Sequence, residues 1–260
     1  DMGLASDLKR LRNVECKDKC VLSVYLNTGP NQQGDWNIHL KNGLKRIGEY
    51  LEASGNEAQQ KSFKKMRKKV EDELGKHRND LARSLVIFAS EENDLFETYY
   101  LQHDVETAFH WETKPVLEPL EALQATYPST GVILTNLDHV TVLDTSLGHI
   151  DAAFSFAFDP ETEEWVRFEG TASGDRMASS SSQVDKFDRR LAENLNRFYR
   201  DLAQTVEQMK GAHDWEGLVV IGEAELANSF RDELRTKPER VIHKNLSKSS
   251  EPKIIEAAFH

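Results

Sequence analysis

From Gly170 to Gln183 the sequence reads GTASGDRMASSSSQ, a run of small residues that ends on one uncharged amide. Apolar residues then recur at spacings of three and four, which predicts one long amphipathic helix with a stripe facing a core. The stripe consists of Val184, Phe187, Leu191, Leu195, Phe198, Leu202, Val206 and Met209. A small-residue loop that leads into a rigid helix is suited to placing Gln183. Its amide can orient water or an RNA end but cannot act as a base near neutral pH.

The segments around this loop alternate between strand and helix patterns. Before the loop, a meander of three strands is predicted at residues 131–135, 140–144 and 150–158. After the long helix, a buried apolar strand, a helix, a strand and a last helix are predicted at residues 217–222, 224–234, 241–243 and 254–259. The alternation predicts an α/β domain over residues 126–260.

The first half of the chain has a similar mixture. Helical patterns are predicted at residues 4–11, 40–51, 63–74 and 117–125. Strands are predicted at residues 20–26, 84–89, 95–102 and 106–111. A polar insertion, Asn31–Trp36, follows the first strand. We therefore expect the fold class to be α/β, with one α/β domain over residues 1–125 and a second over residues 126–260.

Composition excludes several classes of protein. No run approaches 18 apolar residues, so we expect no membrane span. The N-terminus lacks the basic-then-apolar pattern of a secretory signal, so we expect cytoplasmic residence. Neither a phosphate-loop nor a dinucleotide glycine motif is present. The net charge of −11 argues against indiscriminate coating of nucleic acid, although a local basic face is compatible with it.

A basic segment lies between Lys61 and Arg83. It holds nine Lys or Arg residues against four acids. The basic residues are Lys61, Lys64, Lys65, Arg67, Lys68, Lys69, Lys76, Arg78 and Arg83. Two interpretations stay open: a solvated helix face, or a helix that contacts phosphates through residues such as Lys64, Lys65 and Lys68.

Cys16 and Cys20 are the two cysteines of the chain. Their spacing does not indicate a secreted disulfide scaffold, and a zinc site is not expected because a second pair of ligands is missing from the pattern. We expect reduced, structural thiols and no metal or organic cofactor.

The order of elements resembles the central domain of the archaeo-eukaryotic class-1 peptide-chain release factors and of Pelota. In the release factors a Gly-Gly-Gln loop precedes a helix rich in Phe and Arg. Here Ser181-Ser182-Gln183 stands in that place, and residues 184–190 resemble the start of that helix. Residues 21–26 and 84–88 resemble strands of the family's first domain. The chain is thus similar to a bacterial branch of this superfamily, related to factors that release peptidyl-tRNA on stalled ribosomes, and its second domain to their RNase H-like Gln-loop domain.

The sequence also departs from that family. Its stop-codon signatures are not recognisable in residues 29–50 or 87–94, so decoding of a stop codon is not expected. The third domain, which docks a translational GTPase, has no counterpart after His260, so no GTPase partner is implied. Serines replace the loop glycines; a left-handed serine would cost about 1–2 kcal/mol. Related rescue factors keep the Gln while varying the glycines.

The resemblance implies a ribosomal role, with tRNA and rRNA as partners. The implied activity is codon-independent hydrolysis of peptidyl-tRNA during ribosome rescue or translation termination. Gln183 would donate its backbone N–H to the oxyanion and position water, with Ser181 and Ser182 beside it in the catalytic loop. The RNA-binding residues would be Arg176, Lys186, Arg189 and Arg190, together with the basic segment.

Other interpretations remain. Gln183 can be an ordinary residue at a helix N-terminus capped by Ser181 or Ser182. Arg189 and Arg190 can pair with acids one helical turn away. The whole protein can be a Pelota-like factor that binds the ribosome without hydrolysis, or a scaffold that no longer visits the ribosome. Trp36 can stack on a base or pack against the domain.

Overall fold

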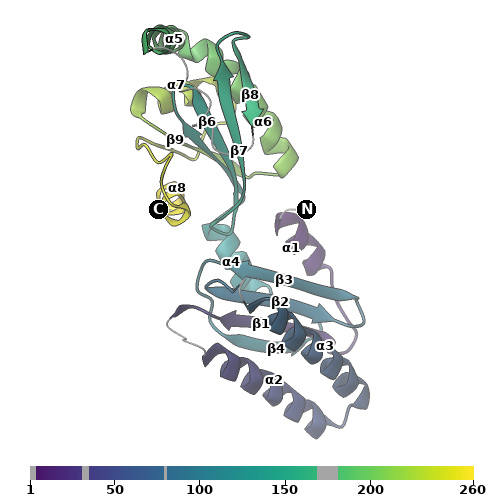
Figure 1. The fold of residues 1–260 in the computed structure, drawn as a ribbon. Coiled ribbons are helices and arrows are strands. Elements are labelled where there is room, and N and C mark those ends of the chain that lie inside the picture. Colours follow the sequence, from purple (N-terminus) through teal and green to yellow (C-terminus); the bar gives the residue numbers. More distant parts are fainter. Residues whose placement is uncertain (1–3, 31–34, 79–80, 169–180) are drawn as a thin grey trace. The chain divides into compact units, whose positions relative to one another are not determined.

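The computed structural model describes residues 4–30, 35–78, 81–168 and 181–260. They form two compact units, residues 1–122 and 123–260 (Figure 1). Each unit is a sheet with helices, so the expected α/β class is confirmed. Assignment of the units to particular release-factor domains stays a prediction.

The first unit contains four strands and the helices around them. In chain order these are α1 (Leu4–Arg12), β1 (Val21–Asn27), α2 (Asp35–Ser54), α3 (Glu57–Lys76), β2 (Ser84–Ser90), β3 (Leu95–Leu101), β4 (Ala108–Glu112) and α4 (Glu118–Thr126), which extends past the unit boundary. The antiparallel sheet has the order β3-β2-β1-β4. Every residue of β2 is buried, as expected for a strand covered on both faces.

Successive side chains of β1 point to opposite faces of this sheet. Leu22, Val24 and Leu26 join the core that α2 and α3 complete through their apolar stripes. On the opposite face, the hydroxyl of Tyr25 donates a hydrogen bond of 2.5 Å to the carbonyl of Val116. The period of two along a strand therefore decides which helices each side chain meets.

Two positions of α2 show how closely this unit is packed. Gly43 faces the ring of Phe109 on β4, where an added Cβ would overlap the ring. Trp36 is partly buried against the core of the unit, which agrees with the packing interpretation of this tryptophan. Residues 31–34 of the polar insertion lie outside the described residues.

The second unit contains six strands and four helices among the described residues. They are β5 (Thr130–Thr135), β6 (His139–Ser146), β7 (His149–Asp159), β8 (Glu164–Phe168), α5 (Ser181–Glu193), α6 (Leu195–His213), β9 (Gly217–Ile221), α7 (Ala224–Glu233), β10 (Arg240–Ile242) and α8 (Glu251–Phe259). The sheet order is β10-β9-β5-β6-β7-β8. Strands β10, β9 and β5 are parallel, and the rest are antiparallel.

Three sequence expectations for this unit were wrong in detail. The meander has a fourth strand, β8, which pairs with β7. The long helix is divided at Asn194, whose side-chain amide donates to the carbonyl of Arg190 at 2.9 Å and competes with regular helix bonding. Helix α5 begins at Ser181, three residues earlier than the pattern indicated.

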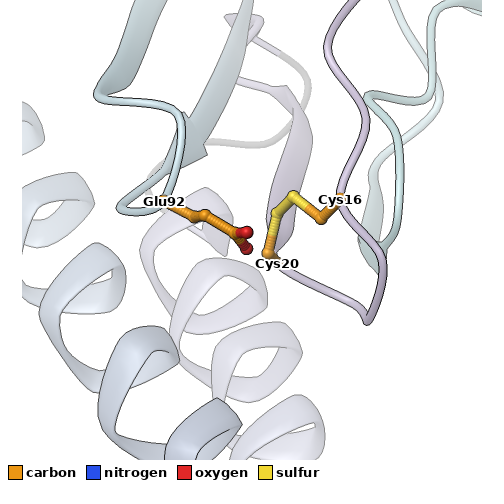
Figure 2. Close-up of side chains that lie close together, drawn as sticks. All are labelled: Cys16, Cys20 and Glu92. Atoms are coloured by element: carbon orange, nitrogen blue, oxygen red, sulfur yellow. A yellow bond between two sulfur atoms is a disulfide. The ribbon is translucent and has the colours of Figure 1, made fainter.

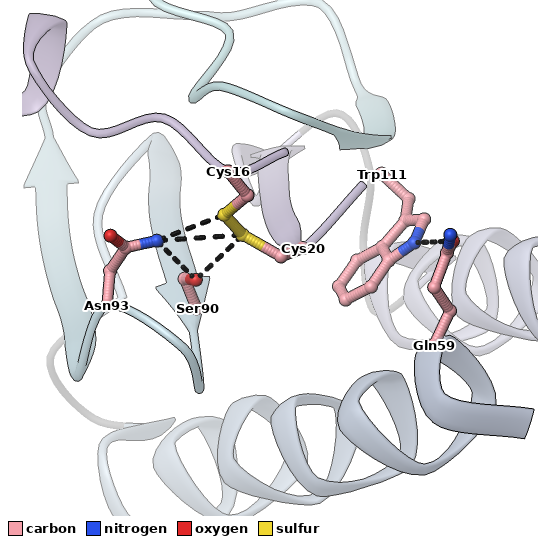
Figure 3. Close-up of a disulfide and its surroundings, with 6 residues drawn as sticks. All are labelled: Cys16, Cys20, Gln59, Ser90, Asn93 and Trp111. Carbon is pink, nitrogen blue, oxygen red and sulfur yellow. Dashed lines mark hydrogen bonds between the residues drawn. A yellow bond between two sulfur atoms is a disulfide. The ribbon is translucent and has the colours of Figure 1, made fainter. Parts of the chain in front are cut away.

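The expectation of reduced thiols was also wrong. Cys16 and Cys20 are joined by a disulfide in the segment between α1 and β1, with their Cα atoms 6.1 Å apart. Figure 3 shows the bond beside Ser90 and Asn93, which lie at the end of β2 and in the turn that follows it. The spacing alone could not reveal this, because the bend at residues 17–19 brings the two sulfur atoms together.

Candidate functional site

The candidate site rests on α6, which covers one face of the second sheet. Its buried residues are Leu195, Phe198, Tyr199, Leu202, Ala203 and Val206. All of them except Phe198 share a core with Ile133 of β5, Val142 of β6 and Val220 of β9. The helical period of the stripe thus produces a fixed support for the segment that precedes it.

Tyr199 is a second anchor of α6. Its hydroxyl donates a hydrogen bond of 2.7 Å to the carbonyl of Asn136, just after β5. Burial raises the pKa of Tyr199 above the ordinary tyrosine value, and the nearby charge of Asp138 raises it further. A neutral phenol that satisfies a buried carbonyl is a structural group here.

An aromatic cluster holds the end of α5 against this support. Leu191 is buried together with Phe158 and Phe198. The rings of Phe158 and Phe198 lie 4.5 Å apart between centroids. The indole N–H of Trp165 on β8 donates a bond of 2.8 Å to the carbonyl of Phe198. Strand β8, which the sequence pattern missed, therefore helps to position α5.

Glu163, in the turn between β7 and β8, interacts with two arginines. Arg190 of α5 donates to its Oε1, and Arg197 of α6 lies 3.4 Å from its Oε2. The pairing of Arg190 differs from the expectation of an acid one turn away on the same helix. Glu163 has a φ of 56°, and its backbone N–H donates to the carbonyl of Asp159 at 2.8 Å.

The three residues expected to be catalytic lie in the first turn of α5. Ser181, Ser182 and Gln183 all have helical backbone. The first four N–H groups of a helix lack partners within it, and the helix dipole places partial positive charge there. The start of α5 is therefore chemically suited to an anionic oxygen. Helical serines also avoid the left-handed conformation that the family's glycines adopt with ease.

The expected RNA-binding residues of this unit are partly described. Lys186 and Arg189 are exposed on α5. Arg190 is exposed too, but it is committed to Glu163. Arg176 lies outside the described residues. The structure thus brings Lys186, Arg189 and Arg190 onto one short helix together with Gln183.

Residues 61–76 of the basic segment lie in α3 of the first unit, whereas Arg78 and Arg83 follow the helix. Phe63, Met66, Val70 and Leu74 face the core, so the lysines between them must point outward. Lys64 and Lys68 are exposed. Lys65 is also exposed, and its Nζ donates to Oε1 of Glu91 at 2.7 Å.

The charge around α3 is mixed. A shallow groove of about 380 Å³ is lined by Lys65, Lys68 and Lys69, but also by Asp72, Glu91 and Asp94. The hydrogen bond from Lys65 lowers the pKa of Glu91 below its ordinary value, and the attraction of that charge adds to the effect. The structure therefore supports both a solvated helix face and a phosphate-binding face limited to particular lysines.

Sequence reasoning missed a His–Asp pair in the second unit. Nδ1 of His213 lies 3.4 Å from Oδ2 of Asp144, and the indole N–H of Trp215 donates to Oδ1 of Asp144 at 2.7 Å. The His213 and Trp215 rings stack with centroids 5.2 Å apart. An added Cβ at Gly131 would overlap the Trp215 ring, so this group is a close-packed structural cluster.

Among the described residues, the group with metal-ligand spacing is Cys16, Cys20 and Glu92, in the first unit and not at α5.

Within the same residues, no helix has the combined length and apolar character needed to cross a bilayer.

Comparison with known proteins assigns the family. The model of the bacterial archaeo-eukaryotic release factor family 5 matches residues 128–260. The chain belongs to this family. It is also 34% identical over 261 residues to the Bacillus subtilis (strain 168) protein named "Uncharacterized protein YocB", covering 98% of both chains. The resemblance to the archaeo-eukaryotic release-factor superfamily is thereby confirmed.

Two solved structures show more distant likeness to this family 5 chain. One is named "Archaeal protein", with 14% identity, a TM-score of 0.37 and coverage of 97% of this chain and 72% of that chain. The other is the archaeal translation termination factor aRF1, with 14% identity, a TM-score of 0.32 and the same coverage. The family assignment rests on the family model.

Proposed function

We propose that this family 5 protein is a codon-independent release factor that hydrolyses peptidyl-tRNA on stalled ribosomal complexes in the cytoplasm. The observation that carries the proposal is the position of Gln183 in the first turn of α5, within a chain of a release-factor family. The substrate is the ester between the nascent peptide and the terminal ribose of its tRNA, and the partners are the ribosome, tRNA and rRNA.

The reaction needs a placed water and a stabilised oxyanion. Water attacks the ester carbonyl carbon, and negative charge develops on the carbonyl oxygen. The backbone N–H of Gln183 donates to that oxygen, and its amide orients the water. The ester C–O bond then breaks, and the proton lost by the water is transferred to the ribose oxygen. Each oxyanion donor can contribute about 3–4 kcal/mol, and orientation of the water about 7–11 kcal/mol.

The surrounding residues have supporting roles in this proposal. Leu191 packs in the aromatic cluster and Glu163 binds Arg190, so both hold the C-terminal part of α5. The position of the first turn of the helix is thereby constrained. Lys186 and Arg189 contact RNA phosphates from the same helix, as does Arg176, which precedes α5 in the sequence and lies outside the described residues. Contacts of this kind orient a protein on RNA and give it a salt-dependent affinity.

One observation favours a second candidate function. Helix α5 already begins at Ser181, so the Ser-Ser-Gln sequence is helical and is not an extended glycine loop. A helical start that reaches the ribosome without projecting Gln183 into the catalytic centre would give a Pelota-like factor that binds without hydrolysis. The two candidates differ in release activity and agree in ribosome binding.

The test is release of a labelled nascent chain from purified stalled bacterial ribosomes and from their large subunits. Wild type is compared with Gln183→Ala and with Gln204→Ala, an exposed glutamine of α6 that serves as the matched control. We expect Gln183→Ala to lower the release rate by at least about 100-fold, because it removes the side-chain amide that orients the water while the backbone N–H stays, and Gln204→Ala to leave the rate unchanged. Equal release by all three proteins would contradict the assignment to Gln183. Binding without release by wild type would select the second candidate.

A further inference from the structure

Polar side chains lie within hydrogen-bonding distance of both sulfur atoms of the Cys16–Cys20 disulfide. The amide nitrogen of Asn93 lies 3.1 Å from Sγ of Cys16 and 3.6 Å from Sγ of Cys20. The hydroxyl of Ser90 lies 3.3 Å from Sγ of Cys20. Neutral sulfur is a weak hydrogen-bond acceptor, whereas a thiolate gains much more from such donors. Figure 3 shows both groups directed at the sulfur atoms, an environment that suits negatively charged sulfur.

A third anionic group faces the same place. A carboxylate oxygen of Glu92 and the two sulfur atoms all lie within 4.8 Å of one another. Figure 2 shows the carboxylate of Glu92 directed toward the disulfide from the turn after β2. A carboxylate beside two thiolates repels their negative charge, so it hinders a purely redox-active pair. A divalent cation between the three groups would turn that repulsion into coordination.

Lys19, which directly precedes Cys20, has two partners of its own. Nζ of Lys19 lies 3.8 Å from the carboxylate of Glu112 and 5.5 Å from the centre of the Tyr50 ring. Both are partners other than Glu92.

The backbone holds the two cysteines in place independently of the sulfur–sulfur bond. The N–H of Cys16 donates to the carbonyl of Thr113 at 2.9 Å, and that of Cys20 to the carbonyl of Glu112 at 3.0 Å. Both cysteines are buried, with 6% and 5% of their surfaces exposed, while Glu92 is exposed. Two buried sulfurs on a fixed backbone and one exposed carboxylate therefore lie together in one place.

We propose that Cys16, Cys20 and Glu92 form a binding site for a thiophilic divalent cation, with Zn²⁺ as the preferred ion, that opens when the disulfide is reduced. Zinc takes thiolate and carboxylate ligands in tetrahedral sites, and three protein ligands leave the fourth position to water. Asn93 and Ser90 donate hydrogen bonds to the coordinating sulfurs, as outer partners commonly do. This reverses our expectation from the sequence, where Glu92 gave no sign of being the missing ligand.

The disulfide is reduced first, and the cation binds in a second step. Two molecules of a thiol reductant break the Cys16–Cys20 bond, giving two protein thiols and one disulfide of the reductant. The cation then binds both sulfurs as thiolates, and two protons are released to solvent. Oxidised protein lacks thiolates and does not bind the ion. Because protons compete with the ion for sulfur, the affinity falls as the pH is lowered.

The test uses the full chain, reduced with a phosphine and freed of metal under anaerobic conditions. Titration with Co²⁺ follows the thiolate-to-cobalt charge-transfer absorption, and Zn²⁺ competing with a chromophoric chelator gives the affinity. We expect one ion per reduced chain and none for oxidised chain. Cys20→Ser should lower the affinity at least about 100-fold, because loss of outer partners alone costs up to that factor.

Glu92→Gln and Glu91→Gln form the matched pair. Both remove one exposed carboxylate from the same turn, but Glu91 is hydrogen-bonded to Lys65. We expect Glu92→Gln to weaken binding by at least about 10-fold and Glu91→Gln to leave it unchanged. Equal effects of the two variants, no binding above that of Cys20→Ser, or a disulfide that is reduced only on unfolding would each overturn the proposal. The glutamate variants keep the disulfide, so their comparison does not depend on how Cys20→Ser folds.

Discussion

Arg190 of α5 is hydrogen-bonded to the carboxylate of Glu163, which lies 27 residues earlier in the turn between β7 and β8. Arg197 of α6 reaches the other oxygen of the same carboxylate at 3.4 Å. One acidic side chain thus joins the helix that begins with the Ser-Ser-Gln sequence to the helix that packs on the sheet. The bond links α5 to the part of the unit with the most extensive core.

Glu163→Gln tests this link. We expect the amides of α5 to exchange with solvent faster, because the variant loses the ion pairs with both arginines. The free energy of unfolding should fall by less than about 1 kcal/mol, since exposed ion pairs contribute little. Hydrogen exchange measured by mass spectrometry gives the first quantity, and urea unfolding the second. Glu233→Gln is the control, because Glu233 lies on α7 and pairs with Arg200 of α6 at 3.1 Å. Equal exchange in α5 of both variants would contradict the role of Glu163.

Two glycines of α2 should respond oppositely to the same substitution. A Cβ at Gly43 would overlap the Phe109 ring, whereas at Gly48 its nearest neighbour would be Phe63 at 3.7 Å, an ordinary contact. We expect Gly43→Ala to destabilise the protein by about 1–3 kcal/mol through overpacking. Gly48→Ala should stabilise it by about 0.5–1 kcal/mol through helix propensity. Thermal unfolding of the two variants decides, and a destabilised Gly48→Ala would show that the position is packed more closely than described.

The general fold could be predicted from periodicity, and its exceptions have physical causes. The unbroken apolar run of β9 indicated a strand covered on both faces, and all five of its residues are buried. The stripe from Val184 to Met209 could not reveal the division at Asn194, because helical spacing continues across it. Strand β8 is short, lies at the sheet edge and has exposed charged residues, so it lacked the alternation that marks half-buried strands.

The candidate site, like the fold, could be predicted from the sequence only in part. The sequence located Gln183 at a helix start, because small residues followed by an apolar stripe mark such a boundary. It gave no sign of Glu163 or Glu92, because each approaches its partners through chain folding over 27 or more residues. A glutamate in a turn is common in any sequence. Only its neighbours in the folded structure show that it has a particular role.

Tyrosine ionisation should be coupled to unfolding at high pH. Burial raises the pKa of Tyr25, Tyr99 and Tyr199, with further increases from Glu118, Asp7 and Asp138 respectively. Because the folded pKa lies above the unfolded value of about 10, the stability contribution is complete below the unfolded value and is lost as the pH rises from there through the folded pKa.

Absorbance of phenolate against pH gives the measurement. The chain has six tyrosines, and we expect Tyr25, Tyr99 and Tyr199 to ionise only together with the loss of circular dichroism. Tyr199→Phe should remove one late-ionising group and leave the early ones. Ionisation of all six tyrosines in the folded protein would contradict the burial that raises these pKa values.

Ribosome binding should distinguish among the lysines of α3. If α3 contacts phosphates, Lys64 and Lys68 are available for this, whereas Lys65 must first give up its 2.7 Å bond to Glu91. We expect Lys64→Ala combined with Lys68→Ala to reduce the slope of log affinity against log salt by about 1.4, at roughly 0.7 for each contact to single-stranded nucleic acid. Lys65→Ala, the matched control on the same face, should reduce it by less. Co-sedimentation with ribosomes over a salt series measures the slopes. Unchanged slopes in every variant would leave α3 as a solvated face and place ribosome contacts on α5, where Lys186 and Arg189 are exposed beside the Ser-Ser-Gln sequence.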